Sequence, residues 1–88
     1  MKIILYVDYS SSKFIEDFNI SNKLLNNHQV LLVINDKQLL SSCEFYDILL
    51  IGNSKQNIVA NDFKMPIIDI KNMSITQIEK ELINKKMS

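Results

Sequence analysis

Residues 2–12 decide the predicted fold, and they read KIILYVDYSSS. Five consecutive apolar residues, 3–7, stand between Lys2 and Asp8. A short apolar run with β-branched members is typical of a strand buried on both faces, as in a parallel sheet. The polar loop that follows ends in serines, which are favoured N-terminal caps of helices. This stretch therefore predicts a buried strand, a loop and a helix, in that order.

Three further apolar runs repeat the pattern. They predict strands at 30–34, 46–51 and 67–70, the last of them directly after Pro66. The predicted helices between and after these runs are 14–25, 38–43, 53–63 and a final helix that begins at Ser74. Alternating strands and helices are typical of a parallel sheet with right-handed crossovers. We therefore expect a single α/β domain, residues 1–88, whose small four-stranded parallel sheet has helices on both faces in a Rossmann-like or flavodoxin-like order.

The first predicted helix has an apolar stripe and an acidic first turn. Glu16 and Asp17 lie where negative charge complements the helix dipole, and residues 19–21 offer a point where the helix can divide, with Ser21 capping the second piece. The apolar stripe consists of Phe14, Ile15, Phe18 and Leu25.

The last predicted helix carries clear signals at both ends. Ser74 with Gln77 three residues later forms a capping box. Lys85 and Lys86 fall in the last turn, where positive charge is favoured.

Composition excludes several classes of protein. The chain has 88 residues, of which 47% are hydrophobic, and this is too apolar for a disordered chain. One Cys excludes an internal disulfide framework and a multi-Cys zinc site, and one Gly excludes glycine-rich phosphate loops. No apolar run approaches the ~18 residues that cross a bilayer, and the N-terminus lacks the pattern of a signal peptide. We expect a cytoplasmic protein without a membrane segment, cofactor or metal.

Charge balance points towards protein partners. Ten basic residues, all of them Lys, balance ten acidic residues. A neutral chain without Arg has no basic footprint for nucleic acid or an anionic membrane. Zero net charge also lowers solubility, which favours a tight protein partner or a homodimer. The abundance of Ile, Asn and Lys indicates a low-GC genome, cellular or viral, such as that of a phage or mobile element.

A binding site is expected where the strands end. In open parallel sheets, ligands bind beyond the carboxyl ends of the strands. The serine loop offers hydroxyls and backbone N–H groups to an anion, but helix capping explains the same serines. Asp8 is a candidate nucleophile or metal ligand if Asp36 or Asn53 lies nearby, and otherwise it is an ordinary strand-end residue. The candidate binding residues are Asp8, Tyr9, Ser10, Ser11, Ser12, Asn35, Asp36, Asn53, Ser54 and Lys55.

The single Cys and the single His are residue types that often carry chemistry, but both are predicted to have no role in a site. Cys43 precedes the third strand, at the amino edge of the sheet, and a free Cys there is expected to be a small buried hydrophobe. His28 lies in the turn before the second strand and is expected to be a surface residue, since a pH-sensing role needs a partner.

Three segments resemble the lactose/cellobiose-type enzyme IIB of the sugar phosphotransferase system. Residues 38–40 leading into 46–52 are similar to that family's helix and third strand, residues 65–70 to its fourth strand, and the serine loop to the end of its phosphate loop. The resemblance implies the same α/β fold. The family's phosphoryl-carrying Cys closes the first strand, where this chain has Val7 or Asp8, and the loop glycines are also missing. The phosphocysteine is therefore not carried over. The serine loop also resembles that of short flavodoxin-like proteins.

Three functions follow from these observations. We expect a non-enzymatic protein-binding module, of the inhibitor, immunity or regulatory-subunit type, because the chain has no evident catalytic set. The first alternative is a phosphocarrier or a degenerate enzyme IIB-like domain, with Asp8 accepting the phosphoryl group or the serine loop binding phosphate. The second is a small nucleotide or flavin binder that uses the first loop.

Overall fold

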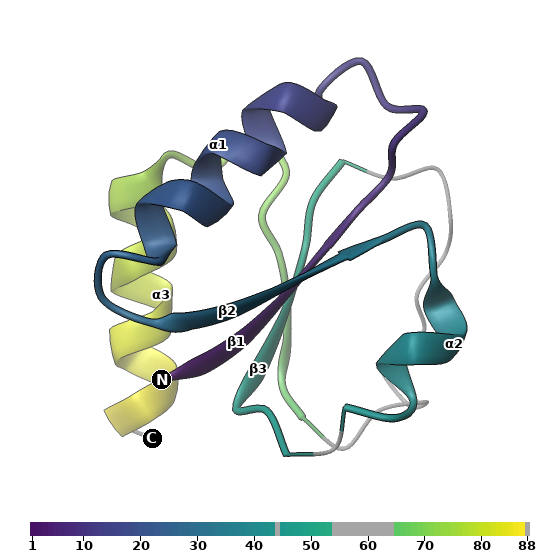
Figure 1. The fold of residues 1–88 in the computed structure, drawn as a ribbon. Helices are drawn as coiled ribbons and strands as arrows, with labels where there is room; N and C mark the ends of the chain where they lie inside the picture. Colours follow the sequence, from purple (N-terminus) through teal and green to yellow (C-terminus); the bar gives the residue numbers. More distant parts are fainter. Residues whose placement is uncertain (44, 54–64, 88) are drawn as a thin grey trace.

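The computed structural model describes residues 1–43, 45–53 and 65–87, which form one four-stranded sheet and three helices (Figure 1). The strands are β1 (Lys2–Val7), β2 (Gln29–Ile34), β3 (Ile48–Ile51) and β4 (Ile67–Asp69). The helices are α1 (Phe14–Leu24), α2 (Lys37–Leu40) and α3 (Ile75–Met87). All strand pairs are parallel and the strand order is β2-β1-β3-β4. The predicted α/β fold is confirmed, in the strand order of flavodoxin-like sheets.

The helix predicted at 53–63 lies outside the described residues except for its first position, Asn53, which belongs to no helix.

The centre of the sheet is β1, which pairs with β2 on one side and β3 on the other. Its side chains alternate between two apolar cores, because successive residues of a strand point to opposite faces. Ile3 and Leu5 pack with α1 and α3, whereas Ile4 and Tyr6 pack with α2. Figure 1 shows the same arrangement, with α1 and α3 beside each other and α2 across the sheet. β1 is buried as predicted.

The prediction that the second strand is buried on both faces is wrong. β2 is an edge strand, and only Val33 of its six residues is buried. A strand at the edge of a small sheet has less of each face covered, because the helices lie over the central strands.

Helix α1 is continuous, so the expected division at residues 19–21 is wrong. Ser21 starts no second helix, because its Oγ donates to the Phe18 carbonyl oxygen at 2.6 Å. The N-cap is Lys13 rather than a serine, and no side chain caps this end. Ser11 instead accepts the Lys13 backbone N–H at 3.0 Å, which forms a turn before the helix.

The buried face of α1 includes only part of the apolar stripe that the sequence suggested. The face turned towards the sheet carries Asp17, Ser21 and Leu24. Ile15 is 65% exposed, Leu25 is 53% exposed, and Phe18 is exposed to a smaller extent. Phe14 and Ile20 also pack against the core from this helix, so its inner face mixes polar and apolar side chains while three large apolar side chains point outwards.

The two other helices begin as their sequences indicate. The capping box of α3 is confirmed, because Ser74 Oγ accepts the Gln77 N–H at 3.2 Å and Gln77 Oε1 accepts the Ser74 N–H at 2.9 Å. Asp36 caps α2 by accepting the Leu39 N–H at 3.1 Å. Within the described residues, no helix has the length and apolar character needed to cross a bilayer.

Candidate functional site at the carboxyl edge of the sheet

The loop after β1 folds around the buried carboxylate of Asp8. Oδ1 of this residue accepts the Ser10 N–H at 2.9 Å and the Ser10 hydroxyl at 2.6 Å. It also accepts from Asn35 Nδ2 at 3.2 Å. A carboxylate prefers charge-assisted donors of this kind. The side chain of Asp8 therefore takes up the donors that an external anion would need.

Most of the loop's backbone donors are engaged within the chain as well. Of the six N–H groups from Tyr9 to Phe14, five donate to partners in the protein: those of Tyr9, Ser10, Ser11, Lys13 and Phe14. An anion-binding loop needs several free N–H groups that converge on one point. This loop is closed on itself instead.

Asn35, at the end of β2, ties the loop to the neighbouring strand. Its Oδ1 accepts the Tyr9 N–H at 2.6 Å, and its Nδ2 reaches Asp8. Its φ of 51° is in the left-handed region, which Asn tolerates better than most residues. Asp8 and Asn35 were both predicted to lie at this edge of the sheet, and the structure brings their side chains into contact.

The Asp36 side chain caps α2 by accepting the Leu39 N–H, and the carboxylates of Asp8 and Asp36 both act on the buried Tyr6. Burial raises the pKa of the Tyr6 phenol above its ordinary value, and the negative charges of Asp8 and Asp36 raise it further. Tyr6 is therefore held in its neutral form. Among the described residues, no group of three or more His, Cys, Asp or Glu side chains is placed to hold a metal ion.

A second buried carboxylate belongs to Asp17 of α1 and contacts the loop that follows β3. Its Oδ2 accepts the backbone N–H of Asn53 at 2.9 Å, and its Oδ1 accepts from Asn53 Nδ2 at 3.0 Å. The contact crosses from α1 to the loop after β3. In the observed strand order, the crevice between β1 and β3 is the topological switch point where ligands usually bind. Asp17 and Asn53 join the two sides of this switch point.

The only glycine of the chain makes this contact sterically feasible. A Cβ placed on Gly52 would lie 2.7 Å from Asp17 Oδ2 and 3.3 Å from the Tyr6 carbonyl oxygen. The backbone angle of Gly52 is not in the left-handed region. Gly52 is therefore needed for space rather than for conformational freedom.

Asp17 was interpreted from the sequence only as a first-turn acid of α1. Burial raises its pKa above the ordinary value, the two hydrogen bonds from Asn53 lower it, and Glu16 raises it again, with a net upward shift. One signal in the sequence was available: a helical period links Asp17, Ser21 and Leu24, and Gly52-Asn53 marks the end of a strand. Neither signal alone indicates that the two segments meet.

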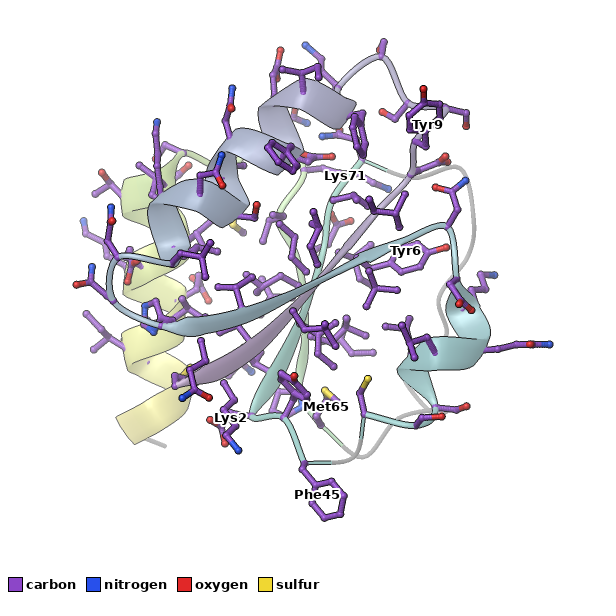
Figure 2. All side chains as sticks on the ribbon, in the orientation of Figure 1. Lys2, Tyr6, Tyr9, Phe45, Met65 and Lys71 are labelled. Atoms are coloured by element: carbon purple, nitrogen blue, oxygen red, sulfur yellow. The ribbon has the colours of Figure 1, made fainter. Side chains whose placement is uncertain are left out.

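Tyr9 projects from the loop and is 72% exposed. Its ring meets the ring of Phe14 edge to face at a centroid distance of 5.3 Å, and Phe14 lies 6.3 Å from Phe18. Figure 2 shows Tyr9 at the outer end of the loop, at the carboxyl edge of the sheet. The aromatic row gives this edge an apolar side.

Three predicted site residues remain, and the structure gives none of them a role at the site. Ser12 is exposed at the tip of the loop. Ser54 and Lys55 lie outside the described residues.

The opposite, amino edge of the sheet holds features that sequence reasoning did not assign to a site. Cys43 is buried as expected, with its Sγ 3.2 Å from the Leu39 carbonyl oxygen. His28 is not a free surface residue, because its Nε2 lies 3.1 Å from Glu79 Oε2 of α3 and the side chain is mostly covered. Two open hollows lie at this edge, and both are lined by Met1 and Asp47.

Comparison of the chain with protein-family models, curated proteins and solved structures finds no match.

Proposed function

We propose that this chain is a non-enzymatic protein-binding module, of the inhibitor, immunity or regulatory-subunit type, which acts in the cytoplasm. The observation that carries the proposal is that two of the chain's own carboxylates occupy the places where a small ligand would bind. Asp8 takes up the donors of the loop after β1, and Asp17 bridges the switch point to Asn53.

The proposed contact surface is the carboxyl edge around Tyr9. A tyrosine is a favourable interface anchor because it offers a large rigid ring and a hydroxyl at a small loss of conformational entropy. The edge-to-face contact with Phe14 holds the ring in place before a partner arrives. Asn35, which accepts the Tyr9 backbone N–H, is exposed beside it and is a polar group of the kind that forms the rim of an interface.

The test is affinity capture followed by a binding measurement with the purified partner. A tagged chain is used to capture proteins from cells of the source organism, or from its host if the source is viral. The dissociation constant of each captured protein is then measured with the wild type, with Tyr9→Ala and with the control Phe45→Ala. Phe45 is 86% exposed at the amino edge (Figure 2), so it matches Tyr9 in type but not in position.

We expect Tyr9→Ala to weaken binding by about 10-fold or more, which is the usual effect of removing an interface anchor, while Phe45→Ala has no effect. A partner that tolerates Tyr9→Ala but is lost with Phe45→Ala would contradict the proposed surface. Robust turnover by the isolated chain would contradict the non-enzymatic assignment.

The phosphocarrier alternative has its own measurement. If Asp8 accepted a phosphoryl group, incubation with a labelled phosphoryl donor would leave an acid-stable, base-labile label that disappears in Asp8→Asn. We expect no label, because the Asp8 carboxylate is buried and hydrogen-bonded to Ser10 and Asn35. A nucleotide or flavin that raises the melting temperature would favour the ligand-binding alternative instead.

A further inference from the structure

The outer edge of β2 presents backbone groups that have no hydrogen-bond partner among the described residues. β2 ends the sheet, and Figure 1 shows it crossing in front of the other strands with no helix over it. The N–H groups of Gln29 and Asn35 donate towards β1, to the carbonyl oxygens of Met1 and Val7. Because successive residues of a strand direct their backbone groups to opposite sides, positions 30, 32 and 34 point outwards. They form a row of donors and acceptors that fits a further strand.

The two edge strands differ in their protection against such pairing. Natural sheets prevent edge-to-edge pairing with short edge strands, charged residues, prolines or bulges. β4 is three residues long, follows Pro66 and ends in Asp69. β2 has six residues, QVLLVI, none of which is charged or a proline, and none has a positive φ. The edge of β2 therefore lacks the protection that β4 has.

The sequence of β2 is complementary to itself in one antiparallel register. Outward-pointing positions of two paired strands face each other, so an even-numbered position pairs only with an even-numbered position. When Leu32 lies opposite its own copy, the apolar run 30–34 lies opposite the same run of the second chain. The next allowed register in either direction places a polar residue, Gln29 or Asn35, opposite an apolar one. The pattern thus selects a second copy of this chain, related by a twofold axis at Leu32.

Pairing in this register also covers apolar side chains that the single chain leaves partly open. Ile34 is 43% exposed, and Val30, Leu31 and Leu32 are only partly buried. Leu32 packs on the face of the sheet that carries α1, and Leu31 packs on the face that carries α2. Opposite residues of an antiparallel pair share a face, so both faces of the junction gain apolar contacts. A second copy therefore supplies hydrogen bonds and apolar burial together.

We propose that the outer edge of β2 is a twofold homodimer interface, in which two copies form one continuous sheet. The register gives about six backbone hydrogen bonds between the copies, two for each outward-pointing pair. A single strand pair buries little area, so we expect a dissociation constant of about 1 μM to about 100 μM. The antiparallel arrangement points the two carboxyl edges in opposite directions, so the Tyr9 surface of each copy is not part of this interface.

The test is sedimentation equilibrium of the full chain from about 0.2 μM to about 1 mM, a range that brackets the expected dissociation constant. We expect the wild type to shift from monomer to dimer. Ile34→Lys should weaken association by about 10-fold or more, because it places on this edge the charge that protects natural edge strands. Ile83→Lys is the matched control, since Ile83 is 55% exposed on α3. Far-UV circular dichroism confirms that each variant is folded.

Cross-linking tests the register, in a Cys43→Ala background. Leu32→Cys places two cysteines opposite each other with their Cα atoms about 5.5 Å apart, which a disulfide can span. Val30→Cys is the control, because its two copies lie about 13 Å or more apart in this register. Oxidised glutathione should convert the Leu32→Cys variant, but not the Val30→Cys variant, into a disulfide-linked dimer.

A chain that stays monomeric at every concentration would overturn the proposal, as would a dimer that tolerates Ile34→Lys or is lost with Ile83→Lys. Cross-linking of Val30→Cys in place of Leu32→Cys would refute the register. A foreign protein that binds a monomeric chain and is lost with Ile34→Lys would assign this edge to another strand and would also overturn the homodimer. None of these variants alters Tyr9, so the proposed function is tested separately.

Discussion

Replacing Gly52 with alanine tests the reasoning about the buried Asp17 carboxylate. The added Cβ would lie 2.7 Å from Asp17 Oδ2 and 2.9 Å from its Cγ. Ordinary contact needs a separation of at least about 3.2 Å, so the carboxylate must retreat by about 0.5 Å. The 2.9 Å bond to the Asn53 N–H then lengthens to about 3.4 Å, beyond a good hydrogen bond.

The size of the effect follows from two opposing terms. Loss of a hydrogen bond to a charged group costs about 1.5–3 kcal/mol. Replacement of Gly by Ala also restricts the unfolded chain, and this stabilises the folded state by about 0.4–1 kcal/mol, which offsets part of that loss. Gly52→Ala should therefore lower the free energy of unfolding by about 0.5–2.5 kcal/mol. In urea this lowers the unfolding midpoint by about 0.5–2.5 M, for a slope of about 1 kcal/mol/M.

The decisive assay is urea unfolding of a double-mutant cycle with Asp17→Ala. Removing the Asp17 carboxylate removes the steric obstacle, so Gly52→Ala should become neutral or mildly stabilising in that background. An equal loss of stability in both backgrounds would refute the explanation, because the cost would then arise from another contact, such as the Tyr6 carbonyl oxygen.

Four further outcomes are expected. Asn35→Ala should lower the free energy of unfolding by about 2 kcal/mol, and Asn35→Gly by about 1 kcal/mol less, because Gly tolerates the left-handed backbone while both variants lose the side-chain bonds; thermal unfolding would show whether this order holds. Asp8→Ala vacates the donors of the first loop, so sulfate should raise the melting temperature of the variant by about 3 °C relative to chloride of equal ionic strength, and should leave the wild type unchanged. Because the pKa of Tyr6 is raised in the folded chain, its contribution to stability is present below its ordinary pKa of 10.0 and is lost at higher pH; absorbance titration at alkaline pH should show one late-ionising tyrosine that is missing in Tyr6→Phe. Because the pKa of Asp17 is raised above 3.8, its contribution is greatest below that pH and falls as pH rises through the folded-state pKa; the free energy of unfolding of the wild type minus that of Asp17→Asn should therefore fall with rising pH, and a rise would contradict the shift.

The sequence was sufficient for the architecture because the signals for it are local. Apolar runs at β1 and β3 and the Ser74 capping box lie within a few residues, and each was predicted from its own segment. These signals do not determine which strand is central, because the apolar run at 30–34 is as long as the run at 3–7 and yet forms the edge strand β2.

The candidate site was predicted less well because its contacts join distant segments. The contact of Asp8 with Asn35 spans 27 positions, and that of Asp17 with Asn53 spans 36. The rule that parallel strands end at the same edge was enough to bring Asp8 and Asn35 together. Nothing comparable identifies a helix residue such as Asp17, since helical periodicity assigns its apolar neighbours to the core.

The mixed polar and apolar inner face of α1 also has a consequence for local unfolding. Leu24 and the Asp17 contact anchor this helix on the sheet, together with the partly buried Phe14 and Ile20, whereas α3 is held by Ile78 and Leu82 deep in the core. Opening of α1 alone leaves the core between β1, β3 and α2 packed, so it costs less free energy than global unfolding. Amide hydrogens of α1 should consequently exchange with solvent faster than those of β1.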